Sequence, residues 1–211
     1  MPGLACDGGA GGFDSAVMDT LEPARTLVDA AHAEDPVRTA GGRPAELVYA
    51  DRVEAWVMRL VPGASPLLRL AARCQHLERW TVPRGSFPEG RAGYLRWRQT
   101  LYARQAERAR GLLLTAGLPG DEAAEVARWV AKADRESNPG TQALEDAACL
   151  VFLENEIGEF AARHAGYPRE KFVAILRKTW RKMTPAAQRA ARALELPPEI
   201  AALVGAAVSA G

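Results

Sequence analysis

Side chains able to hold an anion gather in residues 73–98, RCQHLERWTVPRGSFPEGRAGYLRWR, which contain one histidine, six arginines, two tryptophans and a tyrosine. Arginine guanidinium groups bind carboxylate or phosphate through two donors and also stack on aromatic rings. The alternative is a set of solvated arginines whose aliphatic stems cover a tryptophan. We interpret the stretch as one wall of an anion-binding pocket.

His76 is the candidate general base or metal ligand of this wall. A helix over residues 67–80 would place Arg73 one turn before it. A neighbouring cation favours the neutral imidazole, which is the form that accepts a proton or binds a metal. The alternative is a histidine at the edge of the core that is hydrogen-bonded to the backbone.

The helix expected over residues 90–116 adds candidates for substrate binding. Its N-terminus offers backbone N–H groups that favour an anion near Arg91, and one of its faces carries Tyr94, Arg98 and Gln105. Lys178 is a minor candidate, because a lysine in the last turn of a helix is by default structural. The full set is Arg73, Arg91, Tyr94, Arg98, Gln105 and Lys178.

Glu145 and Asp146 open an apolar helix expected over residues 141–164 and are the acidic partners of His76. Buried carboxylates need partners, because an unpaired buried charge is costly. They cap the helix N-terminus, pair with the arginines, or bind a divalent metal. The candidate catalytic residues are therefore His76, Glu145 and Asp146, and the candidate metal ligands are His76 and Asp146.

The elements that must position these residues are helices. Apolar residues recur at helical spacing from about Asp14 onward, and Pro or Gly stands at most boundaries. No alternating strand pattern or fixed repeat is present. We predict an all-α fold, a single-domain bundle of roughly eight helices over residues 13–211. Residues 1–12, MPGLACDGGAGG, are expected to form a disordered tail.

Bulk composition is typical of a soluble globular protein, with 48% hydrophobic and 25% charged residues and a formal net charge of +1. This charge gives no global basic footprint, so nucleic acid is not an expected partner. The three cysteines, Cys6, Cys74 and Cys149, form no CxxC pair, which favours a reducing compartment. No signal peptide or membrane span is expected. We expect a cytoplasmic protein.

Four segments, RCQHLERWTVPR, GRAGYLRWR, TQALEDAACLVFLE and ILRKTWRKM, resemble the family known as domain of unknown function four-two-zero-two. The resemblance covers about residues 14–194. Members are sometimes labelled glutamyl-tRNA-synthetase-like, although this sequence lacks the nucleotide-binding signatures of those enzymes. The order of histidine and acidic residues is similar to HD-type metallohydrolases, in which separate helices hold a divalent metal. That likeness implies His76 as first ligand and Asp146 as last, around an HD-like core.

The chain departs from the family pattern at two positions. Gln105 stands where the family has histidine, in a pattern like FHAE, and Asn155 follows LVFLE where histidine is usual. Glutamine is a poor ligand for transition metals, so both changes weaken a metal site. Either Glu107 and Glu154 compensate, or the pocket has lost a divalent metal and kept its arginines.

Together these patterns favour an enzyme that binds a phosphorylated or carboxylated small molecule between helices. Hydrolase or lyase chemistry is expected, with His76 as base or ligand. The alternative is a non-catalytic binding or scaffold protein whose arginine and tryptophan surface docks a partner. A third reading, RNA binding, draws on the same residues but lacks the net charge.

Overall fold

The computed structural model describes residues 12–208, with side chains from Leu21 onward, and every regular element among them is helical. The all-α prediction is confirmed, with two more helices than the approximate count. The tail expected over residues 1–12 lies outside the described residues, apart from Gly12, where the first helix begins. The helices are α1 (Gly12–Ala33), α2 (Ala45–Leu60), α3 (Pro66–Arg73), α4 (Gly90–Thr115), α5 (Gly120–Val130), α6 (Pro139–Val151), α7 (Ile157–Arg163), α8 (Arg169–Lys182), α9 (Pro185–Arg192) and α10 (Pro198–Val208).

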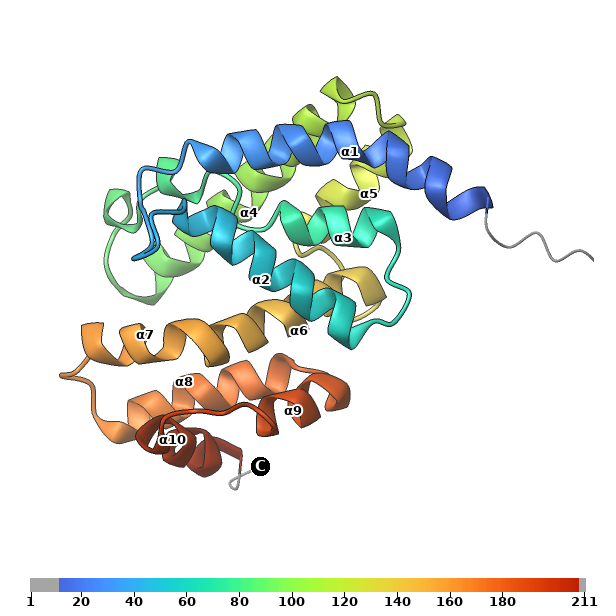
Figure 1. Ribbon diagram of the computed structural model, residues 1–211. Helices are drawn as coiled ribbons and strands as arrows, with labels where there is room; N and C mark the ends of the chain where they lie inside the picture. Colours follow the sequence, from blue (N-terminus) through green and yellow to red (C-terminus); the bar gives the residue numbers. More distant parts are fainter. Residues whose placement is uncertain (1–11, 209–211) are drawn as a thin grey trace, which may run out of the picture.

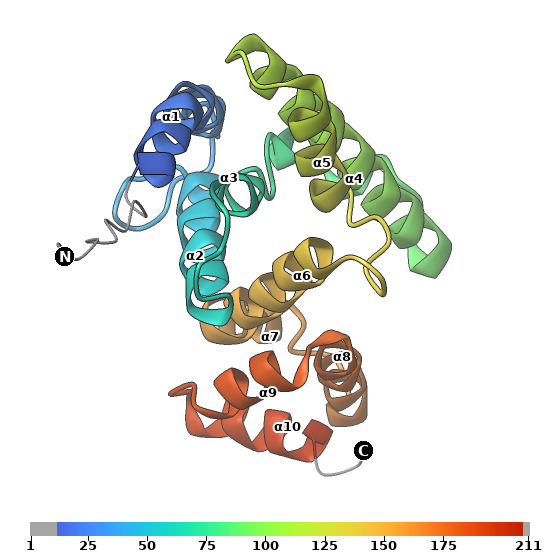
Figure 2. The same ribbon diagram turned by 90° about the vertical axis from the view of Figure 1, so that its right-hand side faces the viewer.

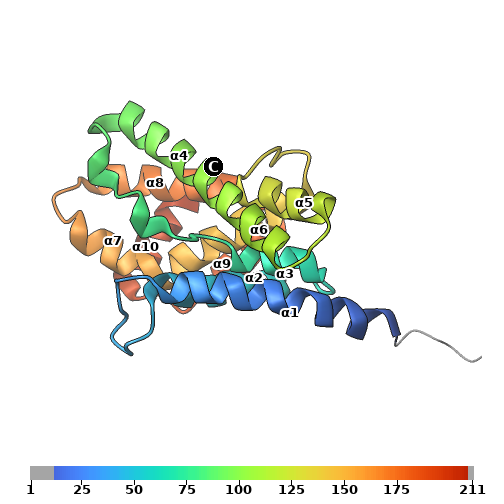
Figure 3. The same ribbon diagram turned by 90° about the horizontal axis from the view of Figure 1, so that it is seen from above.

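Helices α6 and α7 run through the middle of the molecule, with α1 to α5 on one side and α8 to α10 on the other (Figures 1 and 2). Viewed from above, α1 lies along one edge of the bundle (Figure 3). Leu144, Ala147 and Leu150 of α6 are fully buried. A helix that is apolar on all sides normally packs at the centre of a bundle, and α6 does so.

The central helix begins slightly earlier than expected and contains a wide turn. Asn138, rather than Thr141, caps α6: its side chain accepts hydrogen bonds from the backbone N–H groups of Gly140 and Thr141. Pro139 then takes the first helical position, where its missing N–H costs nothing. A π-helical turn, η3 (Phe152–Glu156), joins α6 to α7 without a break in the helical path.

The helix expected over residues 67–80 is wrong in its second half, because α3 ends at Arg73. The chain then turns, and His76 and Glu78 adopt left-handed backbone angles of φ 61° and 51°. A right-handed helix excludes such angles. Two short 3₁₀ turns, η1 (Arg79–Thr81) and η2 (Arg84–Ser86), lead on to α4.

Other helix ends match their sequence signals. Ser65 before Pro66 caps α3, and Thr184 before Pro185 caps α9, each through a side-chain oxygen that accepts a backbone N–H. Gly117, at φ 91°, follows the end of α4 in the left-handed conformation that glycine tolerates. Within residues 12–208, none of the helices is long and apolar enough to cross a membrane.

Candidate functional site

His76 is the centre of a compact polar cluster formed by α2 and the segment after α3. Its Nδ1 lies 3.0 Å from Oε2 of Glu46, and its Nε2 lies 3.0 Å from a guanidinium nitrogen of Arg79. The imidazole also stacks on the ring of Tyr49, with 3.7 Å between centroids and 4° between planes. The contacts therefore hold both ring nitrogens and one ring face of His76.

The Arg79 contact determines which nitrogen of His76 carries the proton. Arginine is always charged and has no acceptor, so Nε2 must be the unprotonated nitrogen. A neutral His76 then carries its proton on Nδ1 and donates it to Glu46. Burial and the positive charge of Arg79 lower the pKa of His76 well below its ordinary value, so the ring is neutral at neutral pH.

Glu46 is the titrating member of the cluster. Burial raises its pKa from 4.5 to about 7, and the attraction of Arg79 only partly opposes this. The backbone N–H of Glu46 donates to Oδ2 of the buried Asp35, which positions the first turn of α2. The Glu46 side chain is 18% exposed and that of His76 is 23% exposed. A carboxyl group that changes protonation near neutral pH is thus accessible to a small molecule.

Three further charged groups, from the turn after α5, from α4 and from the π-helical turn, act on this cluster. Lys132 and Arg98 both lower the pKa of His76 through their positive charge. Glu156, in the π-helical turn, has a raised pKa because of burial and, to a smaller extent, the negative charge of Glu46. Perturbed carboxyl groups and π-helical turns both occur preferentially at functional sites. The environment of His76 is cationic and includes a second perturbed carboxyl group.

The backbone around the cluster is strained. His76, Glu78 and Lys132 all adopt left-handed angles, with φ values of 61°, 51° and 57°. Each such residue costs about 1 kcal/mol or more when it is not glycine, and strained residues of this kind concentrate at functional sites. The segment that contains His76 and Glu78 brings the histidine to the cluster. The turn that contains Lys132 brings a positive charge that acts on His76.

Arg73, expected to hold a substrate anion, is instead part of a buried ion network. Its guanidinium donates to Asp29 through two nitrogens, at 2.5 and 2.9 Å, and to Asp51, and it lies 3.6 Å from Glu54. His32 contacts its backbone carbonyl oxygen at 2.9 Å. These contacts join α1, α2 and α3, and they leave the Arg73 guanidinium no free edge for a ligand.

Glu145 is held between two lysines. Its carboxylate oxygens lie 2.7 Å from Nζ of Lys132 and 2.8 Å from Nζ of Lys182. Burial alone would raise the pKa of Glu145, but the two ammonium groups outweigh it and lower the pKa strongly. Glu145 is therefore ionised at neutral pH, and its partners are lysines rather than the arginines weighed from the sequence.

Asp146 anchors the start of α9. Its Oδ1 accepts from the backbone N–H of Thr184 at 2.9 Å, and its Oδ2 accepts from the Thr184 hydroxyl at 2.6 Å. The amide of Gln142 donates to the same carboxylate at 2.9 Å. The side chain is buried. These bonds tie the central helix to the C-terminal helices.

We expect the substitution Asp146→Ala to lower the free energy of unfolding by about 1–3 kcal/mol, because it leaves the half-buried donors of Thr184 unpaired. Chemical denaturation monitored by circular dichroism measures the loss. Glu159→Ala is the control, since the Glu159 side chain is 84% exposed. Equal stability of the two variants would contradict an anchoring role for Asp146.

The remaining candidates for substrate binding lie at separate places. Arg91, Tyr94 and Lys178 are exposed, on α4 and α8. Arg98 donates to the Tyr94 hydroxyl at 3.1 Å, and its guanidinium lies 4.9 Å from the ring centre of Tyr102. Of this set, only Arg98 acts on His76, and it does so through its charge. Gln105 is buried and lines a pocket on the other side of the segment 77–82.

The residues present do not fit a divalent metal. In the described part of the chain, no group of three or more His, Cys, Asp or Glu side chains is placed to hold one. Nε2 of His76 faces the cationic Arg79, and both oxygens of Asp146 are engaged by Thr184. Glu154 accepts from Nε1 of Trp56 at 2.8 Å.

Sequence reasoning did not single out Glu46, Tyr49 or Arg79. Glu46 and Tyr49 are three residues apart, which places them on one face of α2. This face of α2 is otherwise apolar. The carboxyl group of Glu46 and the hydroxyl group of Tyr49 therefore stand out on it, and they could have indicated a polar site. Arg79 lay within the stretch 73–98, but the expected helix over residues 67–80 gave it no relation to His76.

A family model described as Domain of unknown function (DUF4202) matches residues 22–204. No curated protein and no solved structure matches the chain. The family match covers every helix that contributes to the His76 cluster. It extends through α9 and into α10.

Proposed function

The chain belongs to the family of Domain of unknown function (DUF4202), and we propose that this member is an acid–base enzyme acting on an anionic small molecule, by hydrolase or lyase chemistry. The observation that carries the proposal is the position of His76 between a carboxyl group and a guanidinium. A neutral imidazole next to a carboxyl group with a pKa of about 7 suits proton transfer at neutral pH.

In this proposal, the Nε2 lone pair of His76 is the general base. The Arg79 guanidinium lies against this lone pair, and the Arg79 side chain is 34% exposed, so it can turn outward. A phosphate or carboxylate group of the substrate draws the guanidinium to itself, because charge-assisted bonds to an anion are stronger than a bond to a neutral ring. The same movement frees Nε2.

Proton transfer then uses Glu46. Nε2 removes a proton from water or from a substrate carbon, and the imidazolium that forms is stabilised by the Glu46 carboxylate at Nδ1. The imidazolium later returns this proton to the leaving group, so His76 ends the cycle neutral. Arg79 and Arg98 hold the substrate anion, the role expected of Arg73 from the sequence.

The proposed setting is the cytoplasm. Cys74 and Cys149 are both buried free thiols, which suits a reducing compartment. Burial raises the pKa of each thiol to about 12, so neither is a nucleophile at neutral pH. The proposed partner is an anionic metabolite rather than a membrane or a nucleic acid.

One observation favours the second candidate, a scaffold that docks a partner protein. Tyr94 and Leu95 are 41% and 48% exposed, side by side on the first turns of α4. The exposed Arg91 stands one turn before them. Aromatic residues and arginine are common anchors of protein interfaces. In that case Tyr94→Ala would abolish partner binding, and His76→Gln would not.

The test of the enzyme is a panel of phosphate monoesters and organic acids, first screened by thermal shift and then assayed for turnover by NMR. His76→Gln is expected to lower turnover of any substrate at least about 100-fold, because it removes the base. Arg79→Gln is expected mainly to raise KM for the anion.

Arg181→Gln is the control, because it removes an equal charge from an exposed position of α8. Turnover that survives in His76→Gln would exclude the proposed base. The scaffold would be favoured if compounds of the panel bind but are not turned over, and if His76→Gln binds them with the same affinity as the wild type.

A further inference from the structure

Aromatic rings and a guanidinium group form a continuous row from the surface of α4 to His76. The ring centres of Tyr94 and Trp97 lie 5.8 Å apart. The Arg79 guanidinium lies 5.0 Å from the ring centre of Trp97, and one of its nitrogens lies 3.0 Å from Nε2 of His76. The Tyr94 ring is therefore two contacts away from the guanidinium that takes the anion in the proposed function.

Arg98 joins this row at Tyr94. It donates to the Tyr94 hydroxyl at 3.1 Å, and its guanidinium lies 4.9 Å from the ring centre of Tyr102. Among the residues whose side chains are described, no carboxylate pairs with Arg98. The side chain is half-buried, and its charge acts on His76. Two tyrosines thus hold a guanidinium that has donors left for a phosphate.

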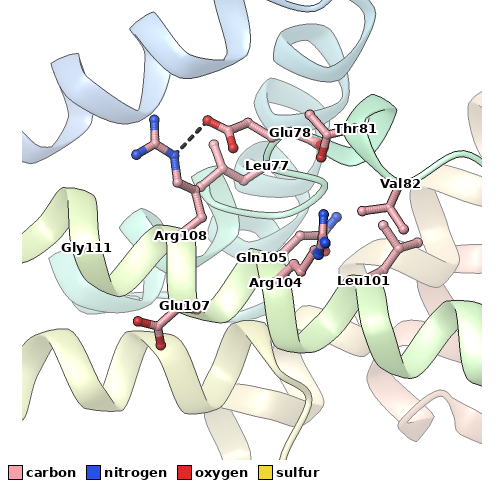
Figure 4. Close-up of a pocket in the computed structure, with 10 residues that line it drawn as sticks. All are labelled: Leu77, Glu78, Thr81, Val82, Leu101, Arg104, Gln105, Glu107, Arg108 and Gly111. Atoms are coloured by element: carbon pink, nitrogen blue, oxygen red, sulfur yellow. Dashed lines mark hydrogen bonds and ion pairs between the residues drawn. The ribbon is translucent and has the colours of Figure 1, made fainter.

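Trp97 fixes the middle of the row. Its Nε1 donates to the backbone oxygen of Val82 at 2.8 Å, and its ring packs with Val82 and Leu101 in a small apolar cluster apart from the main core. Val82 and Leu101 face each other between the segment 77–82 and α4 (Figure 4). Trp97 is only 8% exposed, so it supports its neighbours in the row and offers a ligand little surface.

Tyr94 is the exposed ring of the row, with 41% of its surface accessible. Trp97 meets it at an angle of 48° between ring planes, and Arg98 reaches it through the hydroxyl. Neither neighbour lies flat against the ring, so a ligand has access to a ring face. Exposed aromatic side chains next to cations bind flat rings by stacking, as they do with nucleobases.

We propose that the substrate of the acid–base site is a phosphate monoester that carries a flat aromatic ring. Its phosphate is held by Arg79 and Arg98, and its ring stacks on Tyr94. A phosphate dianion suits two guanidinium groups better than a single carboxylate does. This chemistry has two sources, nucleoside monophosphates and esters with the ring on the ester oxygen. The inference rests on the proposed function, because it places the phosphate at Arg79 beside His76.

Two pairs of ligands test the ring, each titrated into the full chain and followed by ¹H–¹⁵N NMR. AMP is compared with ribose 5-phosphate, and phenyl phosphate with methyl phosphate. In at least one pair, the compound with the ring is expected to bind at least about fivefold more tightly and to shift the indole N–H signal of Trp97. The pair with the larger gain identifies the source of the ring. A smaller gain than this in both pairs would overturn the proposal.

Variants locate the ring, and the gain is compared within each variant so that any effect on the phosphate contacts cancels. Tyr94→Ala is expected to abolish the gain, whereas Tyr94→Phe, which keeps the ring, is expected to retain it. Leu114→Ala is the control, because it removes an apolar side chain with 40% exposure from the other end of α4. A gain that persists in Tyr94→Ala would overturn the proposal.

The same ligands separate failure of this inference from failure of the enzyme. His76→Gln is expected to keep the gain, since binding does not need the base. If ribose 5-phosphate and methyl phosphate bind and the rings add nothing, this inference alone is overturned. If a ring adds affinity but none of the four compounds is turned over, the ligand class is supported and the enzyme is not. If none of the four binds, the phosphate contacts of Arg79 and Arg98 are overturned as well.

Discussion

Replacing Arg73 with leucine is expected to lower the free energy of unfolding by about 3–5 kcal/mol. Arg73 is buried and contacts Asp29, Asp51 and Glu54, which come from two other helices. Removing its guanidinium leaves these carboxylates close together with fewer cations, and an uncompensated buried charge is much more costly than a missing surface pair. Urea denaturation of the variant and the wild type measures the difference.

The matched control is Arg128→Leu. Arg128 pairs with Asp134 at 2.9 Å, but both side chains are more than half exposed, at 61% and 56%. Exposed pairs contribute at most about 1 kcal/mol, so this variant should unfold almost like the wild type. If Arg73→Leu were equally mild, the network would have no structural role, and Arg73 would again be available as an anion-binding residue.

Replacing Glu46 with glutamine is expected to change how stability depends on pH. Burial raises the pKa of Glu46 from 4.5 to about 7. Between these values the native state keeps a proton that the unfolded chain releases, so this group makes the free energy of unfolding fall as pH rises. Glutamine cannot ionise. The stability of the variant relative to the wild type should therefore increase across this window, by about 3 kcal/mol in total.

Chemical denaturation at intervals from pH 4 to pH 8 measures this difference, and Glu125→Gln on the exposed face of α5 is the control. His76 acts in the opposite direction, because its lowered pKa makes stability fall as pH drops below the ordinary histidine value of 6.5. The variant keeps His76, so the difference between the two chains reports the Glu46 carboxyl group together with its effect on the imidazole that it contacts. Parallel stability curves for Glu46→Gln and wild type would contradict a raised carboxyl pKa.

Helices with strong local signals could be predicted from the sequence. Ser65-Pro66 and Thr184-Pro185 each combine a capping hydroxyl with a proline, a pattern typical of a helix start, and a helix begins at each of the two prolines. The end of α3 could not be predicted, because residues 74–82 include no proline or glycine to mark it. Tertiary contacts decide it: Leu77 is 1% exposed and His76 stacks on Tyr49.

The geometry of the candidate site could be predicted only in part, for a related reason. His76 was recognised from its type and its charged surroundings, and it is the centre of the polar cluster. Its partners were not, because charge spacing along one helix cannot tell which acidic residue of another helix will approach it. Arg73 and Glu145 contribute their charges to separate ion pairs, with Asp29 and with Lys132. The pairing of charges is a property of helix packing.

The π-helical turn sets the angular phase of everything that follows it in the central helix. Each residue of an α-helix advances by about 100°, and a π-turn accommodates one extra residue within the helical path. Side chains of α7 therefore point about 100° away from where a continuous helix drawn from α6 would send them. A relative one residue shorter between Phe152 and Glu156 would therefore lack the wide turn, and it would keep both α6 and the present orientation of α7, beginning with Ile157.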